Sequence, residues 1–137
     1  MTLVEELLKA DAKKADELKL GTFKSERLAE ILGKKNPVEV QIREIKSRRL
    51  NDIITYPVDG KGNYDFSKNF EMKLMTCVEG IVNPDVKSKE LQAHFGVDNG
   101  RELVEKLFGS EVTAIADAIS ELSGIKADVD AVEEVKN

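Results

Sequence analysis

The chain has 137 residues, of which 41% are hydrophobic and 34% charged, and its net charge is −5. A chain of this length and composition is most simply one globular domain that needs no metal or disulfide staple. The acidic balance argues against general nucleic-acid binding, and the single cysteine excludes an intrachain disulfide. The sequence has no run of eighteen apolar residues and no signal-peptide start, so we expect a cytosolic protein without a membrane span.

The N-terminal part carries two helical patterns. Residues 2–19 predict a peripheral helix that stops at Gly21-Thr22. A second helix is predicted from Lys24 to Leu32, because Gly33 and then Pro37 follow it in the order usual for a helix end. The apolar face of the first helix consists of Val4, Leu7, Leu8, Ala12, Ala15 and Leu18.

A strand is predicted at residues 38–42, where apolar and polar residues alternate. A single strand needs a partner, and the candidates are residues 54–58 and 63–66, which the turn-rich segment 59–62 joins. The sequence leaves open whether these runs pair. Residues 44–54, between the two regions, have the apolar spacing of a helix.

One apolar stripe occupies residues 66–81, with the three- and four-residue spacing of a helix face. Proline has no N–H and restricts the residue before it, so Asn83-Pro84-Asp85 should end this helix. The stripe consists of Phe66, Phe70, Leu74, Cys77, Val78 and Ile81.

Three more amphipathic helices are predicted after this turn. Ser88 can cap a short helix that carries Leu91 and Phe95 and that Gly96 ends. Asp98 can open the next helix, which Gly109-Ser110 closes before the last helix runs to Gly124. The apolar residues of these last two helices are Leu103, Val104, Leu107 and Phe108, then Val112, Ile115, Ala116, Ile119 and Leu122.

These elements predict a mainly α fold in one domain, residues 1–124. We expect a compact bundle of about six short amphipathic helices, with a small β element around residues 38–42 and 54–66. Residues 125–137 alternate small apolar residues with acidic ones and lack any stripe, which predicts a disordered acidic tail.

No pattern of catalytic or ligand-binding residues emerges. His94 is the only histidine and has no recognisable partner, while Cys77 lies on an apolar face as a core residue would. The segment after Asp59 fails as a calcium loop because Lys61 and Tyr64 stand where a ligand and a glycine belong. We therefore expect no enzyme activity, no metal and no cofactor.

One basic cluster stands out, formed by Arg43, Lys46, Arg48 and Arg49. It is most simply a solvated face of an acidic protein, and the helix after Asp98 has too many acidic residues for DNA recognition. The apolar stripes of the C-terminal half are core by default. As an alternative, a groove between the C-terminal helices could bind a partner's helix through Leu103, Leu107, Phe108 and Val112.

Six motifs occur in a recognisable order and spacing. They resemble those of the XkdN-like phage tail assembly chaperones over most of residues 3–124. The motifs are Leu28-Ala-Glu-Ile-Leu-Gly33, Pro37-Val-Glu-Val-Gln-Ile-Arg-Glu-Ile45, Cys77-Val-Glu-Gly-Ile-Val-Asn-Pro-Asp-Val86, Lys89-Glu-Leu-Gln-Ala-His-Phe-Gly96, Glu102-Leu-Val-Glu-Lys-Leu-Phe108 and Ala118-Ile-Ser-Glu-Leu-Ser-Gly124.

The resemblance implies a small, mostly helical phage or prophage protein in the host cytoplasm. Such chaperones keep the tape-measure protein soluble during tail assembly, help bring tail-tube subunits to it, and are absent from the mature virion. Copies that also touch one another would protect a long chain collectively. The resemblance implies no catalytic residue, nucleic-acid partner or membrane partner. Two alternatives remain, a structural tail or connector protein of the virion and a helical DNA-binding regulator.

Overall fold

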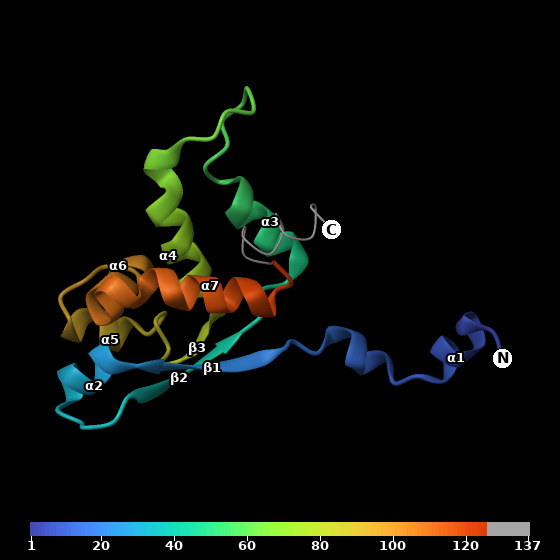
Figure 1. The fold of residues 1–137 in the computed structure, drawn as a ribbon, viewed down its shortest axis with the longest axis horizontal. Coiled ribbons are helices and arrows are strands. Elements are labelled where there is room, and N and C mark those ends of the chain that lie inside the picture. The colour runs from blue at the N-terminus through green and yellow to red at the C-terminus, as the bar shows by residue number, and fades with distance from the viewer. Residues whose placement is uncertain (126–137) are drawn as a thin grey trace, which may run out of the picture.

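The computed structural model describes residues 1–125 and shows a mainly α-helical fold with a small antiparallel sheet (Figure 1). Of the predicted acidic tail, only Ile125 belongs to the described residues, so that prediction lies outside them. The elements are α1 (Leu3–Lys9), a 3₁₀ helix (Ala12–Asp16), β1 (Leu20–Ser25), α2 (Glu26–Leu32), β2 (Val38–Arg43), α3 (Ser47–Thr55), a 3₁₀ turn (Phe66–Lys68), α4 (Asn69–Gly80), β3 (Ile81–Asn83), α5 (Lys89–His94), α6 (Gly100–Phe108), a 3₁₀ turn (Gly109–Glu111) and α7 (Val112–Leu122).

The predicted strand at residues 38–42 is confirmed as β2, the central strand of the sheet. Both expected partners were wrong: β2 pairs with β1 on one side and with β3 on the other, antiparallel in each case. In the expected region 54–66, the only pairing is an isolated bridge between Val58 and Tyr64. The strand β1 occupies the segment where the sequence predicted a helix stop.

Gly21 explains why β1 was missed. It lies within the strand rather than in a turn, and a Cβ atom placed on it would come 2.9 Å from Cδ1 of Leu122 in α7. The glycine therefore lets α7 pack closely on the strand, and it does not mark a turn of the chain. The other side of the sheet is open, since Leu20, Thr22 and Gln41 are exposed.

The core lies where α4, α6 and α7 meet the sheet, as the C-terminal stripes predicted. Leu74 and Cys77 of α4 are buried, and so are Ile115 and Ile119 of α7. A Cβ atom on Gly80 would lie 2.5 Å from Cγ2 of Ile119, so α4 and α7 pack too closely there to leave room for a side chain at position 80. Because α7 contacts both α4 and β1, it joins the helices to the sheet (Figure 1).

Most predicted helix ends in the C-terminal half are confirmed. The Ser88 hydroxyl accepts a hydrogen bond from the Leu91 N–H, and Gly96 and Gly124 have positive φ. The cap of α6 is Asn99 rather than Asp98, with its side-chain oxygen accepting the Glu102 N–H at 2.9 Å. The predicted boundary was therefore wrong by one residue.

The N-terminal prediction is correct only for its first two turns. Helix α1 ends at Lys9, the chain is extended at Ala10, and Asp11 caps a new 3₁₀ helix by accepting the Lys13 N–H. A continuous helix over residues 2–19 was therefore wrong. Residues 1–17 are all exposed, so the apolar spacing has no surface to hold it in one helix. We call residues 1–19 the N-terminal arm.

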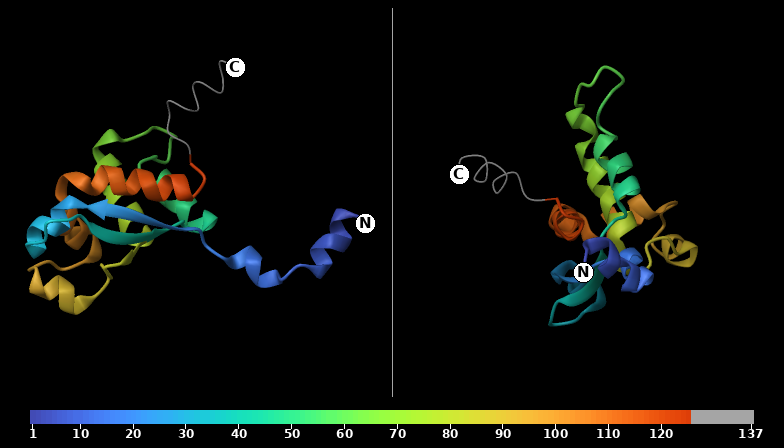
Figure 2. Two further views of the ribbon diagram at one scale, coloured as in Figure 1. Left: turned by 60° about the horizontal axis from the view of Figure 1, so that its bottom comes forward. Right: turned by 90° about the vertical axis from the view of Figure 1, so that its right-hand side faces the viewer.

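Two segments project from the body, so the expected bundle of helices alone is not what forms. The N-terminal arm extends away from one end of the sheet (Figure 1). The helices α3 and α4 contact each other and rise side by side to a loop far from the sheet (Figure 2). We call residues 54–70, at the outer end of these two helices, the aromatic tip.

Candidate partner-binding surfaces

The four residues expected to line a partner-binding groove lie in the core. Leu103, Leu107 and Phe108 form the inner face of α6, which packs against α4 and α2, and Val112 begins α7. Their side chains are 0–3% exposed. The carbonyl oxygen of Val112 also lies 3.6 Å from Sγ of Cys77, inside the protein. In this conformation a partner cannot contact these four side chains.

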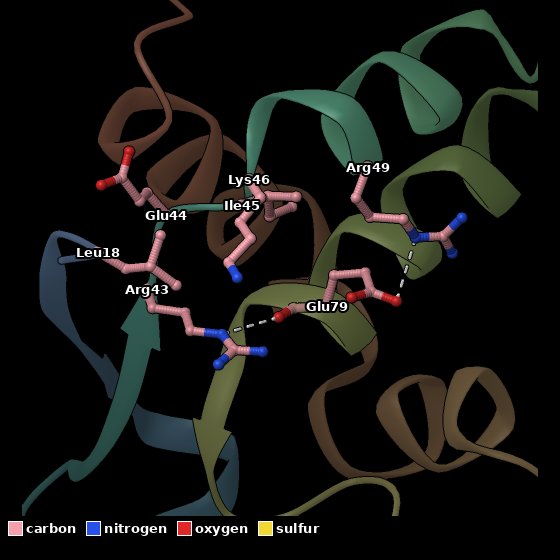
Figure 3. Close-up of a pocket in the computed structure, with 7 residues that line it drawn as sticks. All are labelled: Leu18, Arg43, Glu44, Ile45, Lys46, Arg49 and Glu79. Atoms are coloured by element: carbon pink, nitrogen blue, oxygen red, sulfur yellow. Dashed lines mark hydrogen bonds and ion pairs between the residues drawn. The ribbon is translucent and has the colours of Figure 1, made fainter. Parts of the chain in front are cut away.

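Two of the four basic residues of the cluster, Arg43 and Arg49, make contacts within the chain (Figure 3). Nε of Arg49 lies 3.2 Å from a carboxylate oxygen of Glu79, and Nε of Arg43 donates to the Glu79 carbonyl oxygen at 3.4 Å. A cavity of about 260 Å³ opens beside them. Its lining residues are Leu18, Arg43, Glu44, Ile45, Lys46, Arg49 and Glu79.

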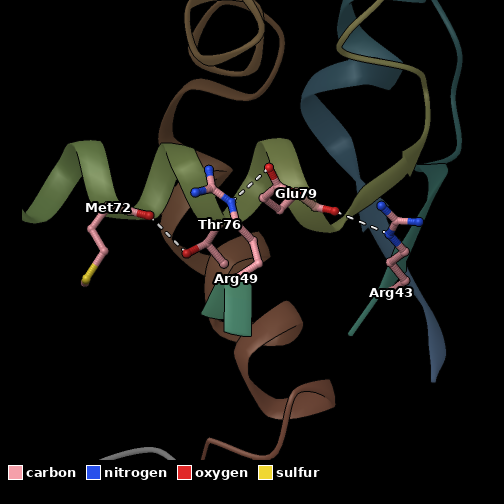
Figure 4. A network of polar contacts seen from close by, with 5 residues as sticks. All are labelled: Arg43, Arg49, Met72, Thr76 and Glu79. Carbon is pink, nitrogen blue, oxygen red and sulfur yellow. Dashed lines mark hydrogen bonds and ion pairs between the residues drawn. The ribbon is translucent and has the colours of Figure 1, made fainter. Parts of the chain in front are cut away.

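This cavity is a poor anion site. Of its basic side chains, Arg49 pairs with the Glu79 carboxylate and Arg43 donates to the Glu79 carbonyl oxygen, while Glu44 accepts the Lys19 N–H at 2.8 Å. Figure 4 shows that Arg43 and Arg49 converge on Glu79 from two different elements, β2 and α3. These contacts therefore fix the start of α3 against the end of α4. Within the described residues, Arg43 and Arg49 therefore stabilise the fold rather than form a free basic surface.

The candidate reactive residues have structural surroundings. Cys77 is buried, and desolvation raises the pKa of its thiol to about 12, so the nucleophilic thiolate does not form near neutral pH. His94 is exposed and its ring meets only the edge of Phe95, at 5.1 Å between centroids. Among residues 1–125, no three His, Cys, Asp or Glu side chains gather as metal ligands. No helix in the same range has the length and apolarity needed to cross a membrane.

The aromatic tip carries six exposed apolar side chains. Four of the seven aromatic residues of the chain lie in these seventeen positions, and Phe66 is 79% exposed. Aromatic side chains are enriched at protein interfaces because they bury a large area with few rotatable bonds. The exposed apolar residues of the tip are Ile54, Tyr56, Val58, Tyr64, Phe66 and Phe70.

Hydrogen bonds hold the loop of the tip in one shape. One carboxylate oxygen of Asp59 accepts the N–H groups of Lys61 and Asn63, at 2.8 and 2.9 Å. Asp65 does the same for Ser67, through both its N–H and its hydroxyl. These bonds stabilise the charged carboxylates and lower the pKa of Asp59 and of Asp65. The aromatic rings are therefore presented on a preorganised loop.

The N-terminal arm is a second exposed apolar surface. Helix α1 buries none of its residues, although four of its seven positions are leucine or valine. An isolated helix of seven residues is not stable in water, so α1 needs a surface that covers it. Its apolar residues, which are 64–80% exposed, are Leu3, Val4, Leu7 and Leu8.

Sequence reasoning missed the aromatic tip. It assigned Phe66 and Phe70 to the inner face of one helix because they continue the stripe of Leu74 and Cys77, whereas Phe66 precedes α4 in a 3₁₀ turn and Phe70 lies in the exposed first turn of α4. A signal was present in the composition: only 5% of the chain is aromatic, and most of it is concentrated in residues 56–70. A core rarely needs such a concentration in one loop.

Comparison with known proteins gives one family and one fold. The family model of the phage XkdN-like tail assembly chaperone proteins matches residues 4–136. This match continues through the acidic segment that the motif resemblance left out. No curated protein matched. Among solved structures, the fold is similar to the crystal structure of the protein yqbn, with 17% sequence identity, a TM-score of 0.56, and coverage of 80% of this chain and 90% of that one.

Proposed function

Because this chain belongs to the phage XkdN-like tail assembly chaperone family, we propose that it binds the tape-measure protein and keeps it soluble during tail assembly. The observation that carries the proposal is the family match over nearly the whole chain. The chaperone acts in the host cytoplasm, brings tail-tube subunits to the tape-measure protein, and is not retained in the virion. This role requires no catalytic group.

The physical basis is the burial of amphipathic helices. A long protein rich in such helices aggregates unless its apolar faces are covered, and a chaperone covers them with exposed apolar surface of its own. Since Leu103, Leu107, Phe108 and Val112 are in the core, the surface for the tape-measure protein must be elsewhere. The net charge of −5 helps to keep the resulting complex soluble.

The open face of the sheet is the part of the body that best suits a helical segment. Leu20 and Val82 lie there with Thr22 and Gln41 around a shallow hollow of about 270 Å³. The opposite face of the sheet is covered by α7, whereas nothing among residues 1–125 covers this one. A helix laid across it would bury the two apolar side chains and leave the polar ones at the rim.

The test is co-expression with the tape-measure protein of the same phage. We expect tape-measure protein to stay in the soluble fraction and to co-purify with the chaperone. If the tape-measure protein is equally insoluble with and without this chain, and the two do not co-purify, the proposed function is wrong. Detection of the chain in purified virions would favour a structural tail or connector protein instead.

Two double variants then test the proposed surface. Leu20→Ser with Val82→Ser removes the apolar groups of the open sheet face and should abolish co-purification. Ile31→Ser with Leu32→Ser, on α2, changes two other exposed apolar side chains and serves as the matched control. If both variants bind the tape-measure protein equally well, the binding surface lies elsewhere on the chain and the proposed function still holds.

A further inference from the structure

Two basic side chains at the start of α3 carry charges that no residue among 1–125 pairs with. Lys46 and Arg48 are exposed and make no ion pair in this range, whereas Arg49 of the same cluster pairs with Glu79. Arg48 makes none even with Asp52, one turn further along α3. Positive charges left in this way attract an acidic ligand. We call Lys46 and Arg48 the open part of the basic cluster.

The chain leads from α7 directly to this surface. The Ser123 hydroxyl accepts the N–H of Ile45 at 2.9 Å and donates to the carbonyl oxygen of Ile119 at 2.8 Å. These two hydrogen bonds fix the C-terminal end of α7 beside the start of α3 (Figure 1). The last described residue, Ile125, is two positions further on, so residues 126–137 begin next to the open part of the basic cluster.

The charge of residues 126–137 is complementary to this surface. The segment contains two lysines and four acidic residues, which are Asp128, Asp130, Glu133 and Glu134. We propose that residues 126–137 bind the open part of the basic cluster of the same chain. Exposed ion pairs are individually weak. A segment that follows Ile125 directly is nevertheless present at an effective concentration of about millimolar order, so a weak contact is sufficient.

The length and apolar residues of the segment suit α3. Twelve residues reach about 40 Å when extended, whereas the nine residues of α3 span only about 14 Å. Leu50 and Ile54 follow Lys46 at four-residue intervals and hence on one side of the helix. Leu50 is half-buried and Ile54 is 44% exposed. The segment has valines at positions 129, 132 and 135, which supply apolar groups to cover Ile54.

This contact gives residues 126–137 a role in what the chain binds. An acidic ligand, nucleic acid included, reaches Lys46 and Arg48 only by displacing the segment. The segment therefore excludes such ligands from the open part of the basic cluster, in addition to the general repulsion from a net charge of −5. The inference requires no tape-measure protein, and its test is independent of the proposed function.

The test is paramagnetic relaxation enhancement in NMR spectra of the full chain. Ala131→Cys places a thiol in the segment without changing its charge. A nitroxide label reacts there selectively, because Cys77 is buried and the pKa of its thiol is raised to about 12. Amide signals of residues 46–55 should lose intensity, while those of residues 31–35 should keep it. The loss should shrink at about 1 M salt, where the Debye length is about 3 Å.

Two results of this first experiment would overturn the proposal. One is a loss of intensity that does not extend from the start of α3 to residues 50–55, because the label would then report only its attachment near Ile125. The other is a loss that high salt leaves unchanged, because charge pairing would then not hold the segment.

Charge-reversing variants identify the surface. Lys46→Glu with Arg48→Glu should restore most of the signal intensity of residues 50–55. Lys34→Glu with Lys35→Glu makes the same change of charge at two exposed lysines that follow α2, and as the matched control it should leave the loss in place. Equal effects of both variants would mean that net charge alone matters, and the proposal would be wrong. All four side chains are exposed, so unchanged circular dichroism and melting confirm folding.

Neutralising the segment is the complementary test and leaves residues 1–125 unaltered. Its four acidic residues are replaced together by amides, as Asp128→Asn, Asp130→Asn, Glu133→Gln and Glu134→Gln. This variant should also lose most of the enhancement on residues 50–55. An enhancement that persists in it overturns the proposal, since no acidic side chain of the segment is then needed.

A mixing experiment separates contacts within one chain from contacts between copies. Isotope-labelled chain without the nitroxide is mixed with unlabelled chain that carries it, so only contacts between copies can reduce the signals. No loss at residues 50–55 is expected in the mixture. If the mixture reproduces the loss, the segment bound there belongs to a second copy and the proposal is wrong.

Discussion

The helices α1 and α7 have similar sequence patterns and opposite surroundings. Both are short amphipathic segments with apolar residues three and four positions apart. In α7, Val112, Ile115 and Ile119 are at most 1% exposed, whereas every residue of α1 is exposed. Periodicity therefore predicts that a helix needs a covering surface, but not whether that surface belongs to the same chain. Four experiments test this difference, beginning with the largest expected effect.

Two phenylalanines give the most direct comparison. Phe108→Ala should lower the free energy of unfolding by about 3–5 kcal/mol, because the ring is fully buried and its removal leaves a cavity. Phe66→Ala should change it by less than about 0.5 kcal/mol, since that ring is exposed. Urea denaturation followed by circular dichroism measures both. Similar losses for the two variants would mean that the aromatic tip is part of the core.

The second comparison concerns two glutamates. The carboxylate of Glu111 accepts the Ser25 hydroxyl at 2.6 Å and the N–H of Glu26 at 3.0 Å, so it ties the start of α2 to the start of α7. Glu111→Ala should cost about 1.5–3 kcal/mol, the range for hydrogen bonds to a charged group. Glu5→Ala in α1 should leave the denaturation midpoint unchanged. If Glu111→Ala leaves the free energy of unfolding unchanged, the hydrogen bonds from Ser25 and Glu26 to Glu111 do not contribute to stability.

The third experiment is a pH titration of stability. Burial raises the pKa of Cys77 from 9.0 to about 12, so the unfolded chain loses the thiol proton before the folded chain does. The thiol's contribution is fully present below about pH 9 and is lost as pH rises toward about 12, by about 1.4 kcal/mol for each pH unit. Comparison with Cys77→Ala isolates this contribution from the other groups that titrate there. Parallel curves would show that the thiol is accessible.

The smallest effect concerns Asp59 in the aromatic tip. The N–H groups of Asn63 and Lys61 lower the pKa of Asp59 below the usual 3.8. The loop therefore keeps these hydrogen bonds in full above pH 3.8 and loses them as the pH falls through the lowered pKa. Carbon-detected NMR of the carboxyl group should show this depressed midpoint. Asp59→Ala should loosen the loop without moving the global melting temperature, because the tip lies outside the core. A clear drop in melting temperature would contradict that separation.

Much of the C-terminal half could be predicted from the sequence. Its caps and stripes are local signals, and Ser88, Gly96 and Gly124 occupy the expected positions. The sheet could be predicted only in its middle strand. The strand β1 contains a glycine that lies against Leu122, a residue about a hundred positions away, and no local pattern carries that information.

The candidate binding residues show a second limit of sequence-based prediction. The stripe of Leu103, Leu107 and Phe108 was correctly placed on one face of a helix, but a face that fits a partner's helix also fits the protein's own core. Which use applies depends on the total apolar area and on how many elements compete to cover it. That balance is a property of the whole fold.

The long-range tie at Glu111 has a consequence for synthesis of the chain. The start of α2 and the strand β1 depend on contacts with Glu111 and with α7, both at the far end of the sequence. A ribosome adds about 5–20 residues per second, so the N-terminal half waits about 5–20 s for the segment that completes it. During that interval, the apolar residues on the inner side of β1 and β2 remain uncovered. Slowing translation near residues 100–120 should therefore increase aggregation more than slowing it near the start.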